Sequence, residues 1–135
     1  MFLGIDFGKK RIGLALGEAI PRGIGFVDGT KSRHLILDEI AKICKEEEVS
    51  KIIIGLPFLG SGDEGFLATE ARQFGVELTG KTMLPVLFEE EQYTSSEAER
   101  ILSEGGVKYD RKDGKVDEMA AILILEQYIN NQKIN

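Results

Sequence analysis

Hydrophobic residues form short continuous runs in some segments and recur every three to four positions in others. Short apolar runs bounded by glycine, proline or charged residues are typical of strands, and they occur at 2–5, 12–16, 23–28, 51–55 and 85–88. Helical spacing of apolar residues predicts amphipathic helices, and it occurs at 35–47, 66–78, 94–104 and 116–130. The predicted order is β-β-β-α-β-α-β-α-α, which indicates an α/β protein.

One strand is predicted to lie inside the sheet. Ile52, Ile53 and Ile54 are consecutive, and an uninterrupted apolar run is typical of a parallel strand covered on both faces. The chain has 135 residues, of which 42% are hydrophobic, so it is long enough to bury a core. This length leaves little room for a second domain. We therefore predict a single domain spanning residues 1–135.

The single cysteine, Cys44, excludes an internal disulfide and suits a reducing cytoplasm. It lies on the apolar face of the helix at 35–47, which predicts core packing for its thiol. The first residues do not resemble a signal peptide, and no apolar run approaches the roughly 20 residues that span a bilayer. These features predict a cytoplasmic protein.

The net charge of −6 argues against broad, non-specific binding of nucleic acid, which requires many contacts with phosphates. The basic residues are nevertheless clustered. One cluster is Lys9, Lys10 and Arg11, and a second comprises Lys108, Arg111, Lys112 and Lys115. Local contacts with phosphate groups are therefore expected at these two clusters.

Asp6 ends the first strand and is followed directly by the basic residues Lys9 to Arg11. A carboxylate beside a group of cations suits a site that takes both a metal ion and a phosphate. The alternative is that Asp6 only forms the turn, because aspartate commonly hydrogen-bonds the backbone two residues further on. Taken alone, the turn is the better interpretation of this stretch.

Two further acidic positions have comparable alternatives. Glu89 to Glu91 follow the fifth strand, at the edge where open α/β sheets bind ligands, although three glutamates can also form a hydrated loop. Asp117 shares the inward stripe of the last helix with Ala121, Ile124 and Tyr128, although it can also stabilise the helix start. The joint placement of these acids favours one common site.

Four segments resemble the YqgF/RuvX family. Asp6-Phe-Gly-Lys-Lys-Arg-Ile-Gly13 is similar to its D-x-G-x-K-R-I-G signature, and Gly55-Leu-Pro57 is similar to its G-L-P motif. Glu90 to Ser95 with Glu97 to Glu99 occupies the place of D-E-R-L-T-S-x-E-A-E. Val116 to Tyr128 resembles V-D-x-x-A-A-x-x-I-L-Q-x-Y. The likeness covers residues 3–129, and four motifs in order are far more specific than one.

The resemblance implies an RNase H-like fold, with a five-stranded mixed sheet, the first three strands antiparallel, and helices on both faces. It also implies a metal-dependent nuclease, a hydrolase of phosphodiester bonds that matures the 5' end of pre-16S ribosomal RNA in ribosome biogenesis. The family was formerly predicted to be a Holliday junction resolvase, so branched DNA is the alternative substrate. The partner is therefore a nucleic acid, and no membrane is involved.

Residue by residue, the resemblance places the family's acidic residues on Asp6, Glu90, Glu91 and Asp117. These are the expected catalytic residues and metal ligands, with Asp6 shared between two ions. Oxygen ligands without a cluster of Cys or His favour Mg²⁺ or Mn²⁺ over zinc. The expected contacts with substrate phosphates come from Lys10, Arg11, Lys108, Arg111, Lys112 and Lys115.

The sequence departs from the family at three positions. Glu90 stands in place of the usual aspartate, Gln92 in place of an arginine, and Leu59 near the place of an asparagine. These changes leave open a non-catalytic nucleic-acid-binding module of the same fold. A sugar kinase or an actin-like ATPase has a similar first hairpin but needs two such domains, which 135 residues do not supply. The sequence leaves open RNA or branched DNA as substrate, and monomer or homodimer as assembly.

Overall fold

The computed structural model describes residues 1–57, 65–91, 95–106 and 113–134. In chain order the elements are β1 (Phe2–Asp6), β2 (Arg11–Gly17), β3 (Arg22–Asp28), α1 (Arg33–Glu46), β4 (Lys51–Leu56), α2 (Phe66–Thr82), β5 (Val86–Glu90), α3 (Ser95–Glu104) and α4 (Lys115–Ile134). The order predicted from the hydrophobic pattern is confirmed. No helix in the described part of the chain is long and apolar enough to cross a membrane.

The strands form one five-stranded sheet in the order β3-β2-β1-β4-β5. β1 pairs antiparallel with β2, and β2 pairs antiparallel with β3. β4 pairs parallel with both β1 and β5. The predicted mixed sheet with its first three strands antiparallel is therefore confirmed, and β4 lies inside the sheet as its isoleucine run predicts.

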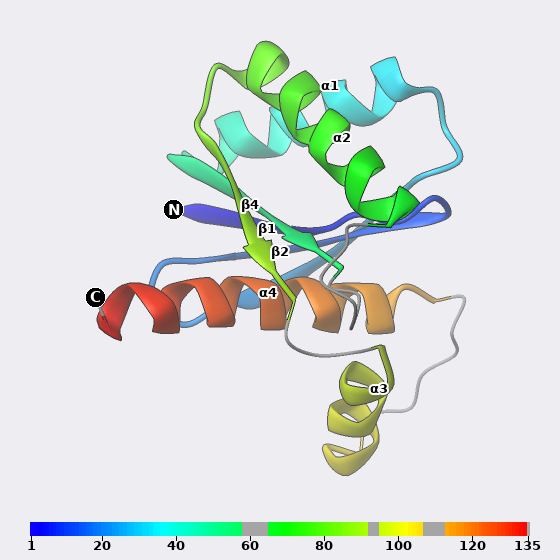
Figure 1. Cartoon of the computed structure of the whole chain (residues 1–135), viewed down its shortest axis with the longest axis vertical. Coiled ribbons are helices and arrows are strands. Elements are labelled where there is room, and N and C mark those ends of the chain that lie inside the picture. Colours follow the sequence, from blue (N-terminus) through cyan, green and yellow to red (C-terminus); the bar gives the residue numbers. More distant parts are fainter. Residues whose placement is uncertain (58–64, 92–94, 107–112, 135) are drawn as a thin grey trace.

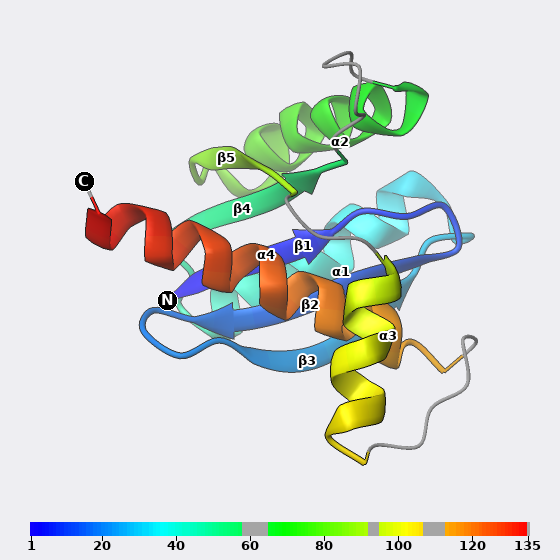
Figure 2. The same cartoon turned by 60° about the horizontal axis from the view of Figure 1, so that its bottom comes forward.

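Helices cover both faces of the sheet, as predicted (Figure 1). α1 and α2 lie together on one face, and α4 crosses the opposite face (Figures 1 and 2). α3 packs against α4 on the side away from the sheet (Figure 2). The sheet is thus the middle layer, and each face of it contributes to a hydrophobic core.

The isoleucines of β4 show why that strand is continuously apolar. Ile52 and Ile54 belong to the core that includes Phe74 of α2. Ile53 belongs to the core that includes Ile124 of α4. All five side chains are 0% exposed, because alternate residues of a strand point to opposite faces and both faces are covered here.

The first half of α4 rests directly on the backbone of the sheet. A Cβ atom at Gly13 of β2 would lie 1.9 Å from the carbonyl oxygen of Asp117. Glycine is therefore required at position 13 for the helix to approach so closely. A second contact comes from Glu118, whose Oε2 accepts a hydrogen bond from the backbone N–H of Gly25 in β3 at 2.6 Å. Together these contacts fix the first turn of α4 against β2 and β3.

Some elements extend beyond the predicted boundaries. α2 continues through Gly80 to Thr82 and ends at Met83, which has the left-handed φ of 60°. β5 includes Glu89 and Glu90 because both pair with β4, and ladder hydrogen bonds outweigh the weak strand propensity of glutamate. α4 continues to residue 134. Glu89 and Glu90 therefore belong to β5 itself, and Glu91 follows the strand directly.

Candidate active site

Asp6 is the last residue of β1 and lies opposite Gly13 of β2. Side chains alternate between the two faces along a strand. Gly4, two residues before Asp6, faces Ala121 and Leu125 of α4. Asp6 therefore points to the face of the sheet that α4 covers, at the carboxyl end of β1.

Glu91 follows β5 directly. Its backbone N–H donates a hydrogen bond to the carbonyl oxygen of Leu56 at 2.9 Å, which extends the pairing with β4 by one residue. Its Oε1 atom would lie 2.8 Å from a Cβ atom placed on Gly55, beside the side chain of Ile124 in α4. Glu91 therefore lies on the α4 face as well, at the same edge of the sheet as Asp6.

The consecutive glutamates are divided between the two faces of the sheet. Glu89 lies on the α4 face, where its Oε2 accepts hydrogen bonds from Gln127 at 2.6 Å and from Asn131 at 2.8 Å. Glu90 alternates to the opposite face, and it is exposed. The hydrated-loop interpretation therefore does not describe Glu89 or Glu91, and Glu91 is the glutamate that lies near Asp6.

Asp117 lies in the first turn of α4, with its side chain turned toward β2. Its Oδ2 accepts a hydrogen bond from Nε of Arg11 at 2.9 Å. The side chains of Arg11 and Asp117 are 25% and 22% exposed, so this ion pair is partly shielded from water. At the start of the helix it is Asp113 that accepts a hydrogen bond from a backbone N–H, that of Lys115 at 3.0 Å. The described bond of Asp117 is thus a tertiary contact.

The carboxyl group of Asp6 is influenced electrostatically by those of Glu91 and Asp117. The pKa of Asp6 is raised well above its ordinary value of 3.8, first by burial and then by the negative charges of Glu91 and Asp117. Burial raises the pKa of Glu91 to about 7. Repulsion between like charges weakens with distance, so Asp6 lies within electrostatic reach of both other acids. We call Asp6, Glu91 and Asp117 the acidic cluster.

The donor atoms of the acidic cluster fit a hard divalent cation. All are carboxylate oxygens, which Mg²⁺ and Mn²⁺ prefer, and a cation would favour the charged forms of Asp6 and Glu91. As the described side chains are placed, no three potential ligands are close enough to hold one ion, and Asp117 is bonded to Arg11. The structure brings the acids to one edge without closing them around a metal.

The predicted phosphate-binding residues are only partly described. Lys10 is exposed on the turn after β1, whereas Arg11 is paired with Asp117. Lys115 is exposed at the start of α4, with its Nζ 4.0 Å from a carboxylate oxygen of Asp113. Several predicted or divergent positions lie outside the described residues, namely Leu59, Gln92, Lys108, Arg111 and Lys112.

Glu118 supports the site without having been predicted. Its carboxyl group lies over Gly23, where a Cβ atom would be 2.4 Å from its Cδ, and it binds the backbone of Gly25. Two nearby glycines in β3 and an acid next to Asp117 are the sequence signals for this contact. Neither signal identifies the contact without knowledge of which strand lies under α4.

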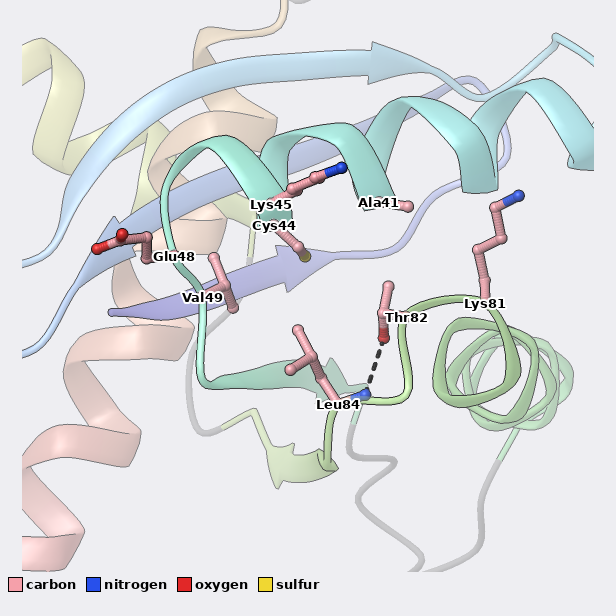
Figure 3. Close-up of a pocket in the computed structure, with 8 residues that line it drawn as sticks. All are labelled: Ala41, Cys44, Lys45, Glu48, Val49, Lys81, Thr82 and Leu84. Carbon is pink, nitrogen blue, oxygen red and sulfur yellow. Dashed lines mark hydrogen bonds between the residues drawn. The ribbon is translucent and has the colours of Figure 1, made fainter.

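A cavity of about 470 Å³ lies elsewhere, between the C-terminal ends of α1 and α2 (Figure 3). Its described lining includes Cys44, Lys45, Glu48 and Thr82. Cys44 is 5% exposed, as its core position predicts, and burial raises its pKa to about 11. A thiol in this state is a poor nucleophile, so the acidic cluster remains the better candidate for chemistry.

One family model and several curated proteins match nearly the whole length of this chain. The family model described as "RuvX: Holliday junction resolvase" matches residues 1–131. A protein of Lactococcus lactis subsp. cremoris named "Putative pre-16S rRNA nuclease" is 33% identical, over 95% of this chain and 92% of the relative. A protein of Haemophilus ducreyi with the same name is 38% identical, over 96% of this chain and 95% of the relative.

Solved structures agree on the fold. RuvC of T. thermophilus in complex with a Holliday junction substrate aligns with a TM-score of 0.62 and 14% identity, over 99% of this chain and 96% of that chain. Thermus thermophilus RuvC alone aligns with a TM-score of 0.59 and 13% identity, over 98% and 95%. At this level of identity the likeness concerns the fold, and it confirms the predicted RNase H-like architecture.

Proposed function

Because the chain belongs to the RuvX family, as its resemblance indicated, we propose that it is a metal-dependent nuclease that processes the 5' end of pre-16S ribosomal RNA. The curated relatives that carry this name cover nearly the whole chain. We further propose that residues 1–135 form one catalytic domain. We propose that it acts in the bacterial cytoplasm, where a ribosomal precursor would be processed. Its assembly is proposed to be a monomer or a homodimer.

The observation that carries this proposal is the convergence of the acidic cluster. Asp6 from β1, Glu91 after β5 and Asp117 from α4 come from distant parts of the chain, yet the latter two both raise the pKa of Asp6. The charged forms of Asp6 and Glu91 are unfavourable in this partly shielded place unless a further cation balances them, because only Asp117 is paired with Arg11. Such an arrangement is typical of a functional site.

We assign metal binding to the acidic cluster, in which Asp6, Glu91 and Asp117 would together hold Mg²⁺ or Mn²⁺, two ions as the family resemblance implies. We favour Glu91 over Glu90 because Glu90 is exposed on the opposite face of the sheet. When bound, such ions stabilise the attacking water and the leaving oxygen of a phosphodiester. Nucleases with a RuvC-like fold generally use divalent metal ions.

The basic residues orient the substrate in this proposal. Lys10 and Arg11 neutralise the scissile phosphate next to Asp6, and Lys115 holds the neighbouring backbone at the start of α4. We extend the same role, on sequence grounds, to Lys108, Arg111 and Lys112. Contacts with phosphates position a nucleic acid without distinguishing RNA from DNA, so the substrate must be established by cleavage.

A second candidate function is resolution of branched DNA. The description of the matching family model names a Holliday junction resolvase, which favours this alternative over a non-catalytic binding module. A two-fold symmetric dimer would suit a four-way junction. A monomer would suit trimming of one RNA end. Loss of the chemistry is the least favoured interpretation, because Asp6, Glu91 and Asp117 are all retained.

Parallel cleavage assays separate these functions. The purified protein is incubated with a precursor 16S RNA fragment and with a synthetic four-way DNA junction, in buffers containing Mg²⁺, Mn²⁺ or EDTA. We expect metal-dependent cleavage of the RNA near the mature 5' end. Preferred cleavage of the junction would support the DNA alternative, and binding of either substrate without cleavage would contradict a nuclease.

Metal binding should depend on pH through Glu91. Its pKa of about 7 means that a proton competes with the metal below neutrality. Mn²⁺ affinity should therefore rise by at least about tenfold between pH 6 and pH 8, because a proton on Asp6, whose pKa is also raised, competes with the metal as well. Isothermal titration at several pH values measures this dependence, and Glu91→Gln should bind Mn²⁺ more weakly and with a flatter pH profile.

The metal-free protein should respond to pH in the opposite sense. A carboxyl group whose pKa is raised in the folded state stabilises the fold below its unfolded pKa, and that contribution is lost as the pH rises to about 7. Urea unfolding in EDTA should show a smaller decrease of stability with pH for Glu91→Gln than for the wild type. Equal pH dependence of the stability of the two proteins would contradict a raised pKa of Glu91 in the folded state.

A further inference from the structure

The ion pair between Arg11 and Asp117 joins one expected phosphate ligand to one proposed metal ligand. The two residues lie on β2 and α4, and Nε of Arg11 is 2.9 Å from Oδ2 of Asp117. In this arrangement Nε of Arg11 is bonded to Asp117 and cannot bind a phosphate, and the positive charge of Arg11 lies beside a carboxylate oxygen of Asp117 that a metal would need. The pair therefore affects both phosphate binding and metal binding at this site.

The other basic residues of this turn do not make the same contact. Lys9 extends to the opposite face, where its Nζ is 4.0 Å from a carboxylate oxygen of Glu70 and 4.7 Å from the ring centre of Phe66. Lys10 is exposed. Of the basic run Lys9 to Arg11, only Arg11 has a described bond to the acidic cluster.

Neighbouring acids are engaged by other groups. Asp28 lies opposite Arg11 in the β2–β3 register, but its Oδ1 accepts hydrogen bonds from the backbone N–H and hydroxyl of Thr30, at 2.9 and 2.6 Å. Glu118 accepts from the backbone of Gly25. Asp117 is therefore the described acid best placed to pair with Arg11 while nucleic acid is absent.

Resting on the proposed function, we propose that Arg11 is an exchangeable counter-ion of Asp117. In the free protein its guanidinium neutralises Asp117. When a phosphodiester enters, the guanidinium moves to the phosphate oxygens, which are equally good partners for an arginine, and Asp117 becomes available to a divalent cation. Nucleic acid and metal then bind with positive coupling, and by linkage each increases the affinity of the other.

This exchange gives the enzyme an order of assembly. Without substrate, the positive charge of Arg11 opposes a cation at Asp117, so the complete metal site is disfavoured. With substrate in place, the same guanidinium neutralises the scissile phosphate. The site is thus completed where a phosphodiester is present to be cleaved.

The first test measures Mn²⁺ affinity without nucleic acid, by electron paramagnetic resonance of free Mn²⁺. The variants are Arg11→Gln and Lys10→Gln, which remove the same charge from adjacent positions. We expect about tenfold tighter binding for Arg11→Gln and a much smaller change for Lys10→Gln. Equal effects of the two variants, or weaker binding by Arg11→Gln, would overturn the proposal.

The second test measures binding of a labelled single-stranded RNA in EDTA, where metal-dependent cleavage does not occur. Asp117→Asn releases Arg11, so it should tighten RNA binding several-fold. The same substitution in an Arg11→Gln background should have a clearly smaller effect, whereas in a Lys10→Gln background the gain should persist. An equal gain from Asp117→Asn in the Arg11→Gln background would show that Arg11 is not exchanged.

The two tests distinguish this inference from the function on which it rests. A wild-type protein that binds Mn²⁺ through Asp6, with affinity unchanged by Arg11→Gln, would refute the exchange and leave the nuclease assignment intact. A wild-type protein with no Asp6-dependent Mn²⁺ binding, with or without RNA, would refute the metal site itself. Circular dichroism of each variant confirms that the fold is retained.

Discussion

Replacing Asp6 with asparagine should abolish cleavage and leave the protein folded. Asp6 is the acid whose pKa both Glu91 and Asp117 raise, so it has the central electrostatic position in the cluster. Asparagine keeps the size of the side chain but removes the charge that would bind two cations. We expect the rate to fall about a thousandfold or more, equivalent to about 4 kcal/mol of transition-state stabilisation. Single-turnover cleavage of the preferred substrate measures this loss.

Glu90→Gln is the matched control for Asp6→Asn. It removes an acid close to Glu91 in sequence but exposed on the opposite face of the sheet, so it should change the rate by only about threefold or less. Thermal unfolding in EDTA at pH 8 should show Asp6→Asn to be at least as stable as the wild type, because the raised pKa of Asp6 means that its charge destabilises the metal-free fold. A folded Asp6→Asn protein with wild-type activity would contradict our assignment.

Gly13→Ala should have the second large effect, on both stability and activity. The added Cβ would lie 1.9 Å from the carbonyl oxygen of Asp117 and 3.0 Å from the backbone nitrogen of Glu118. Because these are backbone atoms, the whole first turn of α4 must move. We expect a loss of about 3 kcal/mol in the free energy of unfolding. A shift of about 1 Å in Asp117 should lower the cleavage rate about a hundredfold.

Gly80→Ala provides the control for Gly13→Ala. Gly80 lies in α2, and a Cβ atom there would meet nothing within 4 Å. Alanine favours a helix interior over glycine by roughly 0.5–1 kcal/mol, so this variant should be slightly more stable than the wild type. Urea unfolding of both variants tests the comparison. A Gly13→Ala protein as stable as the wild type would show that α4 does not depend on close contact at this point.

The order of the elements could be predicted from sequence because it depends on local patterns, whereas the topology of the sheet was implied by the family resemblance. The run Ile52 to Ile54 indicates a strand buried on both faces, and the helical spacing of Ala121, Ile124 and Tyr128 identifies the face of α4 that is buried against the sheet. Such patterns are informative because apolar residues occupy the positions of a strand or helix that face the core. Element ends were less well predicted, since pairing with β4 extends β5 into the glutamates.

The choice between Glu90 and Glu91 could not be made from sequence. It depends on the register of β5 against β4, in which Gly55 pairs with Glu89 and Leu56 pairs with Glu90. A shift of one residue would exchange the faces on which the glutamates lie. Three identical residues in a row give no periodic signal, so only the three-dimensional structure distinguishes them.

The pairing of Arg11 with Asp117 was also beyond sequence reasoning. The two residues are 106 positions apart, and Arg11 was expected to contact phosphate because it belongs to a basic cluster. What brings them together is the close packing of α4 on Gly13 of β2, a tertiary contact. Glu118 illustrates the same limit, since its bond to Gly25 depends on α4 lying across β3.

The most direct test of our account is a Mn²⁺ titration of the wild type and of Asp6→Asn, in the presence of a single-stranded RNA that saturates the protein. We predict that the wild type binds Mn²⁺ at a site that is absent from Asp6→Asn, although both proteins are folded and bind the RNA. Identical Mn²⁺ binding by the two proteins would show that Asp6, Glu91 and Asp117 do not form a metal site, and it would contradict the proposed nuclease mechanism.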